Sequence, residues 1–285
     1  MSPLSTKMIV KTFASLSAML LIPVIILAQT EIGLQLYTFR NQIPKDVSGM
    51  LQKISNMGIR EIEGGGTYGL PIDSFKLLLQ KNNLKMISIG AGFKELDTNA
   101  QATVDRAKTF GAAYVTCTWI PHENGFTIDH AKQAVDVFNK AGKLLKENGI
   151  SLVYHPHGYE FGTYEGNTVF DYMVKNMNPA YANFEMDVFW IKHPGQDPVA
   201  LLKKYPKRFL LMHLKDRKPG TTGNQDGKAD VESNVILGAG DVGIADIMRE
   251  APGAGVKHYF IEDESSRSEQ QVPESLSFLK NLRKK

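Results

Sequence analysis

The chain has 285 residues, of which 42% are hydrophobic and 22% are charged, values typical of a globular protein. Its formal net charge of +3 gives no broadly basic surface for nucleic acid. The single cysteine, Cys117, excludes an internal disulfide framework. A chain of this length can form one large barrel or two smaller domains.

Residues 1–28 have the pattern of a secretory signal peptide. Lys7 and Lys11 give a positive start, an apolar stretch follows, and Ala28 supplies a small residue before the cut. The alternative is an uncleaved membrane anchor, which the short apolar run and its Pro23 disfavour. We therefore expect the protein to be exported, either to the periplasm or by secretion, with no membrane anchor after cleavage.

Short β-like runs alternate with amphipathic helical runs over the rest of the chain, residues 30–285. The predicted strands are residues 32–38, 60–64, 85–90, 113–119, 151–157, 182–190, 209–216 and 257–264. Repeated strand–helix units of this number match a single (β/α)8 TIM barrel of the α/β class. A doubly wound sheet is the alternative, but the first predicted strand is not followed by the glycine-rich turn of a dinucleotide site. The longest irregular stretch, residues 217–237, follows the seventh strand.

Metal-binding side chains occur at the ends of the four last predicted strands. They are His155 and His157, Glu185 and Asp187, His213 with Lys215 and Asp216, and Glu262 with Glu264. The C-terminal ends of barrel strands meet on one face, so these side chains are expected to share a pocket. Each position alone is consistent with a solvated strand end, but the set is costly to bury unless a cation is shared. Carboxylate and imidazole ligands suit Mn²⁺, Mg²⁺, Co²⁺, Fe²⁺ or Zn²⁺ alike.

Several motifs between residues 32 and 282 resemble those of a known family. They are Gly33-Leu34-Gln35-Leu36-Tyr37-Thr38, Tyr154-His155-Pro156-His157 with Glu160-Phe161, Met186-Asp187-Val188-Phe189-Trp190, His213-Leu214-Lys215-Asp216, Leu237-Gly238-Ala239-Gly240-Asp241 and Ile261-Glu262-Asp263. The chain resembles the xylose-isomerase-like TIM-barrel superfamily, in its sugar phosphate isomerase/epimerase branch.

The resemblance implies one divalent metal ion held by two glutamates, an aspartate and a histidine. It assigns Asp187, His213 and Glu262 as metal ligands. Relatives often carry the first glutamate where this chain has His155, so Glu160 is the substitute ligand. Glu160 and Glu262 are then the expected catalytic acid/base pair. His155 is also given a catalytic role, with direct ligation or substrate binding left open as alternatives.

The remaining pocket residues are expected to contact the substrate. Lys215 would meet a substrate oxygen, and Asp216 would orient His213 or Lys215. The other expected contacts are His157, Tyr37, Trp119, Trp190 and Glu63. The three aromatic residues are equally consistent with core packing, and Glu63 with a solvated strand end.

The implied reaction is that of a metal-dependent sugar isomerase or epimerase working through an enediolate. Export and the lack of a phosphate-gripping glycine loop after strands seven and eight predict a non-phosphorylated carbohydrate. One alternative is a lyase that eliminates the aglycone from 3-keto-glycosides. A second is an inactive exported carbohydrate-binding barrel, because the first glutamate is missing and Ala239 stands where relatives often carry Glu. No nucleic-acid partner is expected, and a homo-oligomer is left open.

Overall fold

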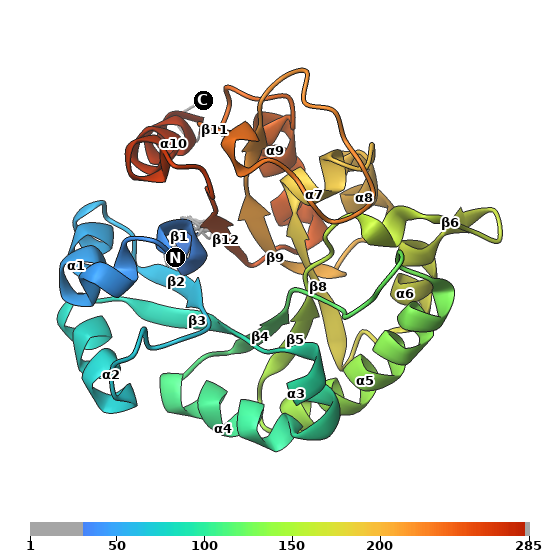
Figure 1. The fold of residues 1–285 in the computed structure, drawn as a ribbon, viewed down its shortest axis with the longest axis horizontal. Coiled ribbons are helices and arrows are strands. Elements are labelled where there is room, and N and C mark those ends of the chain that lie inside the picture. Colours follow the sequence, from blue (N-terminus) through green and yellow to red (C-terminus); the bar gives the residue numbers. More distant parts are fainter. Residues whose placement is uncertain (1–30, 283–285) are drawn as a thin grey trace, which may run out of the picture.

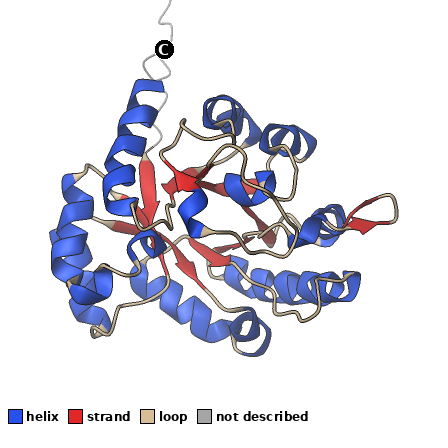
Figure 2. Cartoon of the chain, turned by 45° about the horizontal axis from the view of Figure 1, so that its top comes forward, coloured by secondary structure: helices blue, strands red, loops and turns tan. Residues whose placement is uncertain are grey.

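The computed structural model describes residues 31–282, so the predicted signal peptide lies outside the described residues. Eight parallel strands close into a barrel in the order β1-β12-β9-β8-β5-β4-β3-β2. Helices form a layer around these strands (Figures 1 and 2), which confirms the predicted TIM barrel. The barrel strands are β1 (Ile32–Gln35), β2 (Glu61–Gly64), β3 (Lys85–Gly90), β4 (Tyr114–Cys117), β5 (Ser151–Tyr154), β8 (Ala182–Asp187), β9 (Phe209–Leu214) and β12 (His258–Ile261).

The helices bury one apolar face each against the barrel. In α5, Ala131, Val135, Phe138 and Leu145 form this face, and their spacing is that of an amphipathic helix. The α-helices are α1 (Val47–Asn56), α2 (Ile72–Lys81), α3 (Phe93–Thr98), α4 (Ala100–Phe110), α5 (Ile128–Glu147), α6 (Val169–Asn176), α7 (Val188–Lys192), α8 (Pro198–Lys204), α9 (Ile244–Ala254) and α10 (Ser268–Leu282). Between β5 and α6 lie the short helix η3 (Tyr159–Phe161) and the hairpin of β6 (Thr163–Tyr164) and β7 (Asn167–Thr168).

Several barrel strands end earlier than the sequence pattern predicts. After β1 the chain enters the short helix η1 (Leu36–Phe39), because the Gln35 side chain accepts a hydrogen bond from the N–H of Tyr37. After β8 it enters α7, because Oδ1 of Asp187 accepts hydrogen bonds from the N–H groups of Phe189 at 2.8 Å and Trp190 at 3.1 Å. Polar side chains at these strand ends thus turn the chain out of the barrel, a capping role that such residues favour. Tyr37 and Trp190 therefore lie beyond the strands on which they were expected.

A glycine makes room for the apolar layer inside the barrel. Gly33 pairs in register with Phe260, and a Cβ atom at Gly33 would lie 2.5 Å from Cδ1 of Phe260 and 2.7 Å from the carbonyl oxygen of Glu61. The Phe260 ring packs in one buried cluster with Ile87, Val153 and Leu211. Because inward positions alternate along a strand, the residues two places further on in β5, β9 and β12 are His155, His213 and Glu262. The apolar layer therefore supports the polar strand ends.

The irregular stretch at residues 217–237 lies beside α7, α8 and α9 (Figure 1), and it reaches the cavity through Gly227, Lys228, Ala229, Val231 and Asn234. The antiparallel strands β10 (Asp216–Arg217) and β11 (Asn234–Val235) close its two ends. A Cβ atom at Gly227 would lie 2.8 Å from Cδ1 of Tyr159 and 3.1 Å from Cζ3 of Trp119. The loop thus forms part of the pocket wall.

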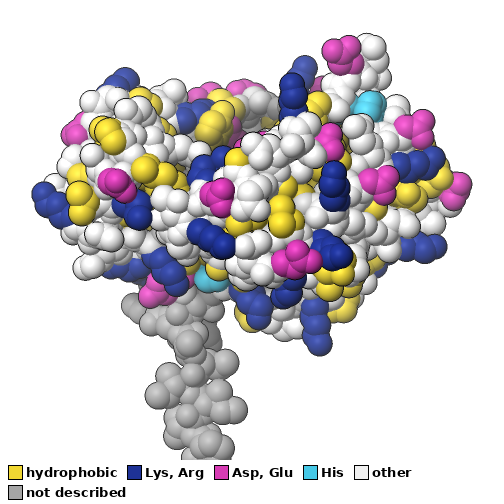
Figure 3. All heavy atoms as spheres, turned by 90° about the horizontal axis from the view of Figure 1, so that it is seen from below, with side chains coloured by type: hydrophobic (Ala, Val, Ile, Leu, Met, Phe, Trp, Pro, Cys, Tyr) yellow, Lys and Arg dark blue, Asp and Glu magenta, His cyan; other side chains and the backbone are white. Residues whose placement is uncertain are grey.

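Basic and acidic side chains are interspersed on the face drawn in Figure 3, with no continuous block of either sign. A nucleic-acid-binding face would instead gather Lys and Arg. Within residues 31–282, no helix is both long and apolar enough to cross a membrane.

The contact between Gly33 and Phe260 predicts a stability effect. Gly33→Ala places a methyl group in occupied space, so we expect its free energy of unfolding to fall by about 1–3 kcal/mol. The control is Gly253→Ala in α9, where a Cβ atom would meet nothing within 4 Å and stability is expected to hold or rise slightly. Thermal unfolding followed by circular dichroism measures both. Equal midpoints for Gly33→Ala and the wild-type protein would contradict this packing.

Candidate metal centre

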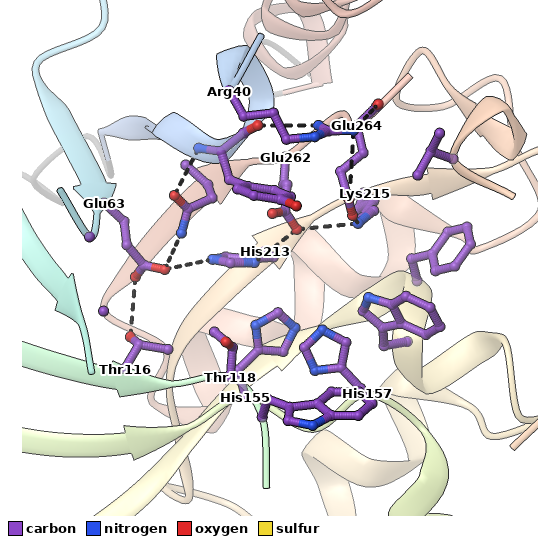
Figure 4. Close-up of a pocket in the computed structure, with 18 of the residues that line it drawn as sticks. Arg40, Glu63, Thr116, Thr118, His155, His157, His213, Lys215, Glu262 and Glu264 are labelled. Carbon is purple, nitrogen blue, oxygen red and sulfur yellow. Dashed lines mark hydrogen bonds and ion pairs between the residues drawn. The ribbon is translucent and has the colours of Figure 1, made fainter. Parts of the chain in front are cut away.

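The C-terminal ends of the barrel strands surround a cavity of about 680 Å³. His213 lies near its centre, with Glu63 on one side and Glu262 and Lys215 on the other (Figure 4). His155 and His157 lie next to each other beneath it, with their ring centroids 4.5 Å apart. Strands from both halves of the chain thus supply the polar lining, as the sequence predicts.

Three buried residues, Asp187, His213 and Glu262, present atoms at the spacing of ligands to one ion, and His155 lies beside one of them. Nε2 of His155 lies 3.5 Å from Oδ2 of Asp187. Nδ1 of His213 lies 3.9 Å from the same oxygen and 3.3 Å from Oε2 of Glu262. Ligand atoms that are each about 2.0–2.2 Å from one metal ion have a similar mutual spacing. Among the described residues, Asp187, His213 and Glu262 form one group able to hold a metal, and His155, Glu185 and His213 form another.

Several of these buried atoms lack hydrogen-bond partners. Within residues 31–282, no hydrogen bond is made by either ring nitrogen of His155, by Oδ2 of Asp187 or by Nδ1 of His213. Unpartnered polar atoms are costly in a buried site. A divalent cation bound to them would remove that cost, so the donor set fits the predicted metal ion.

The other nitrogen of His213 is held by carboxylates. Its Nε2 lies 3.0 Å from Oε1 of Glu63 and 3.2 Å from Oε1 of Glu185. When Nε2 carries the proton and donates a hydrogen bond to Glu63, the lone pair of Nδ1 is free to bind a metal. Metal-bound histidines commonly have such a carboxylate partner on their other nitrogen. Burial raises the pKa of Glu185 to about 8. Burial also opposes ionisation of Glu63, but the nearby His213 lowers the pKa of that carboxyl.

The electrostatic environment of the cluster favours a cation. Burial alone would lower the pKa of His213. The negative charges of Glu185, Glu262 and Glu63 have the larger combined effect and raise this pKa well above its usual value. Burial and the His213 charge lower the pKa of His155 to about 3. His155 is therefore neutral at pH 7 and can offer a lone pair.

Asp187 is oriented by the helix that follows it. Its Oδ1 accepts the two N–H groups at the start of α7, which leaves Oδ2 directed at His155 and His213. The carboxylate therefore caps α7 with one oxygen and faces the cluster with the other.

Glu160 does not lie where it was predicted. Its carboxylate accepts hydrogen bonds from the Tyr154 hydroxyl, from the N–H of His157 at 3.2 Å and from the N–H of Gly158 at 2.8 Å. Gly158 has a φ of +97°, and Glu160, which bonds to this turn, is not among the described residues that line the cavity. Burial raises the pKa of Glu160 to about 7. The expected ligand and acid/base role is thus replaced by a positioning role for the turn that carries His155 and His157.

Asp216 also acts differently from the prediction. Its carboxylate accepts hydrogen bonds from the backbone N–H groups of Arg217, Gly238, Gly240 and Val242. It fastens the residues that follow the long loop to β10, and among residues 31–282 its carboxylate forms no hydrogen bond or ion pair with the side chains of His213 or Lys215.

The predicted substrate contacts all line the cavity, namely His157, Lys215, Tyr37, Trp119, Trp190 and Glu63. Lys215 is 1% exposed, and its ammonium group bonds to Glu262 at 3.3 Å and to Glu264. Although burial opposes its charge, Glu262 and Glu264 raise the pKa of Lys215. Lys215 therefore stays protonated at the edge of the cluster.

Glu185, which the sequence offers as a metal-binding side chain without a specific role, shares the inward face of β8 with Asp187. Two further polar residues were not predicted to belong to the site. Gln35 donates a hydrogen bond to Glu63, and Thr116 lies 3.3 Å from the other carboxylate oxygen of Glu63. No spacing in the sequence links these last two residues, because only barrel closure brings β1, β2 and β4 together.

Substitution of one carboxylate at a time tests the ligand assignment. Glu262→Gln removes a charged ligand, and we expect its affinity for Mn²⁺ to fall by more than about 100-fold. Glu160→Gln is the matched control and is expected to bind Mn²⁺ as the wild-type protein does. Metal stoichiometry and Mn²⁺ titration give the readout. Loss of metal from Glu160→Gln with retention in Glu262→Gln would reverse the assignment.

The role of Glu63 is tested separately. Glu63→Gln removes the negative charge that holds His213 in its ligating form, so the affinity for Mn²⁺ should fall by about 10–100-fold. Glu61→Gln is a control on the same strand, since Glu61 pairs instead with Nδ1 of His258 at 2.7 Å. Equal affinities in the two variants would show that Glu63 does not support the metal ligand.

Three known proteins illustrate what this chain is similar to. The crystal structure of a sugar phosphate isomerase/epimerase from Parabacteroides distasonis is 27% identical and has a TM-score of 0.71, covering 88% of this chain and 98% of that one. A xylose isomerase-like TIM barrel protein from Mycobacterium smegmatis, in complex with magnesium, is 16% identical with a TM-score of 0.68, covering 89% of this chain and 96% of that one. This second likeness shows the fold alone.

An inosose dehydratase from Clostridium tetani is 34% identical over 92 residues, which are 32% of this chain and 30% of that relative. This match spans about a third of the length of the curated relative. Residues 51–282 match the family model described as xylose isomerase-like TIM barrel. Since that match covers most of the chain and includes the strands that carry the cluster, the chain belongs to the xylose isomerase-like TIM-barrel family.

Proposed function

We propose that this protein is a divalent-metal-dependent sugar isomerase or epimerase that acts through an enediolate on a non-phosphorylated carbohydrate. The observation that carries the proposal is the buried group of Asp187, His213 and Glu262 beside Lys215, with His155 3.5 Å from Asp187. A bound divalent ion would supply a Lewis acid that polarises the sugar carbonyl. The ligands of the ion would be His155, Asp187, His213 and Glu262.

The chain's own groups have distinct roles in this reaction. Glu262 accepts the proton from the carbon next to the carbonyl and returns it, because its carboxylate lies at the cavity and is ionised. Burial opposes that charge, but Lys215 and His213 hold the pKa of Glu262 well below its usual value. Lys215 donates a hydrogen bond to a substrate oxygen that gains negative charge. Trp190 is buried beside the ammonium group of Lys215, which lies 5.8 Å from its ring centre, and keeps water away.

The position of Glu160 bears on the type of proton transfer. Epimerisation at one carbon needs a group on each face of the sugar, whereas aldose–ketose isomerisation can return the proton on the same face. Glu160, the expected second carboxylate, is bonded to Tyr154 and Gly158 and is not among the described residues that line the cavity. Glu63 is bonded to His213 and Gln35, and Glu264 to Lys215. We therefore assign proton transfer to Glu262 alone, which favours isomerisation over epimerisation.

A lyase reaction is the second candidate, in which the aglycone leaves a 3-keto-glycoside. The inosose dehydratase similarity favours it, since removal of water next to a ketone uses the same proton abstraction. His155 supports the lyase reaction as well. It stands where relatives often carry a glutamate, so the second carboxylate of an acid/base pair is missing.

A neutral substrate is proposed from the cations around the cavity. Lys215 bonds to Glu262 and Glu264, and Arg40 bonds to backbone oxygens of Tyr37 and Glu264. Both are engaged within the protein, and Lys228, on the long loop, is the one further Lys or Arg among the described residues that line the cavity. We also propose export, on the pattern of residues 1–28, which is consistent with an unphosphorylated sugar.

Proton exchange tests the proposal directly. Protein loaded with Mn²⁺ is incubated in D₂O with free aldoses and ketoses or with a phenyl 3-keto-glucoside, and NMR follows the carbon-bound protons. We expect deuterium at the carbon next to the carbonyl, with a loss of about 10²–10⁴-fold in Glu262→Gln and none in Glu160→Gln. Interconversion of free sugars identifies the isomerase, and release of phenol identifies the lyase. Metal-loaded protein that exchanges no proton in any of these sugars would refute both.

A further inference from the structure

The cavity has a second half that the metal cluster does not occupy. The cluster side chains come from β5, β8, β9 and the end of β12, whereas β2 and β3 lie across the barrel. Figure 4 shows this division, with Glu63 and Thr116 on the opposite side of the pocket from Lys215 and Glu264. The wall on the β2 and β3 side is formed largely by glycine, at Gly64, Gly65, Gly66 and Gly90.

Three of these glycines are not required by the backbone. Gly65, Gly66 and Gly90 have no left-handed φ, so other residues can adopt their conformations. A Cβ atom at Gly65 or Gly66 would meet no heavy atom closer than 4.0 Å, and one at Gly90 would lie 3.6 Å from Cα of Gly65, an ordinary contact. Neither strain nor crowding therefore calls for glycine at these positions. Their effect is to leave open space along this wall.

Aromatic residues stand on both sides of the glycine wall. Tyr37 follows β1 and Trp119 follows β4, the strands that flank β2 and β3 in the barrel. Both line the cavity, and their exposed fractions are 52% and 40%. Tyr159 holds Trp119 in place, with ring centroids 5.0 Å apart. Exposed aromatic faces inside a pocket commonly mark ligand contacts.

We infer that the bay formed by Gly64, Gly65, Gly66 and Gly90, between Tyr37 and Trp119, is a second subsite. It binds an uncharged ring that is joined to the reacting sugar through a glycosidic oxygen. The inference rests on the proposed function, which places the reacting sugar at the metal cluster. A cavity of about 680 Å³ is within the range of about 300–1,000 Å³ that holds drug-sized ligands, and it exceeds the needs of one hexose.

The charge of the bay supports an uncharged ring. On β2, β3 and the residues that follow them, Glu63 is the one charged residue among those described as lining the cavity, and it bonds to His213 and Gln35. The cations outside this wall are Lys215, Lys228 and Arg40, and Arg40 lies 4.6 Å from the centre of the Tyr37 ring and bonds to backbone oxygens. The bay therefore suits the uncharged second ring of a glycoside or disaccharide.

Paired ligands test this subsite without measuring turnover. Methyl and phenyl glycosides of glucose, galactose and mannose are titrated into the metal-loaded full chain by calorimetry, with cellobiose, lactose and mannobiose as the sugar–sugar arm. We expect at least one pair in which the second ring tightens binding about tenfold. A preference for the phenyl ligand identifies an aromatic ring in the bay, and a preference for the disaccharide identifies a second sugar.

Two variants locate the effect, and one controls for it. Gly65→Val fills the bay, so it should abolish the preference while leaving methyl glycoside binding unchanged. Trp119→Ala removes one wall and should also abolish the preference. Gly92→Val is the matched control. Gly92 is exposed, has a φ of −72°, and would meet nothing within 4 Å. This variant should retain the tenfold preference.

The outcomes separate the subsite from the proposed function. Equal binding of one-ring and two-ring ligands, a preference that survives both variants, or no binding in any pair would overturn the subsite. Proton exchange on free monosaccharides, together with equal binding of one-ring and two-ring ligands, would support the proposed function and refute the subsite. A preference for two-ring ligands without metal-dependent proton exchange would support the subsite and refute the proposed function.

Discussion

The convergence of buried carboxylates on the imidazole of His213 is the interaction on which the site depends. Glu63 and Glu185 approach one ring nitrogen, and Asp187 and Glu262 approach the other. Each of these side chains is nearly or fully buried, where an uncompensated negative charge is costly. A cation among them offsets that cost, and the atoms without hydrogen-bond partners face the place where it would bind. The chemistry follows from this concentration of charge, since a metal ion held there polarises a bound carbonyl.

The surrounding residues hold this arrangement in place without joining it. Glu160 fixes the turn after β5, Asp216 fixes the end of the long loop, and the apolar layer around Phe260 supports the strand ends from below. Both acids are buried and satisfied mainly by backbone N–H groups, which is a structural use of a carboxylate. A few defined hydrogen bonds therefore connect the rigid barrel to the segments that carry the proposed ligands.

The barrel was predictable because its signal is periodic and local. Alternating strands and apolar helical stripes recur along the whole chain, and parallel strands with short connections close in only a few ways. Asp187, His213 and Glu262 were predictable from strand phase and family resemblance together. Glu160 was misplaced because a single left-handed residue, Gly158, reverses the chain direction, and such a turn is not visible in a motif. The bond between Gln35 and Glu63 depends on closure of the barrel between segments far apart in the sequence.

The structure therefore separates two candidate ligands that the sequence leaves as alternatives. His155 lines the cavity and Glu160 is not among the described residues that do, so the proposed shell has two histidines and two carboxylates in place of one histidine and three carboxylates. A crystal structure of the Mn²⁺-loaded protein, with anomalous scattering recorded for the metal, tests this directly. The account predicts one anomalous peak coordinated by His155, Asp187, His213 and Glu262. A peak bound to Glu160, or no peak among these residues, would contradict it.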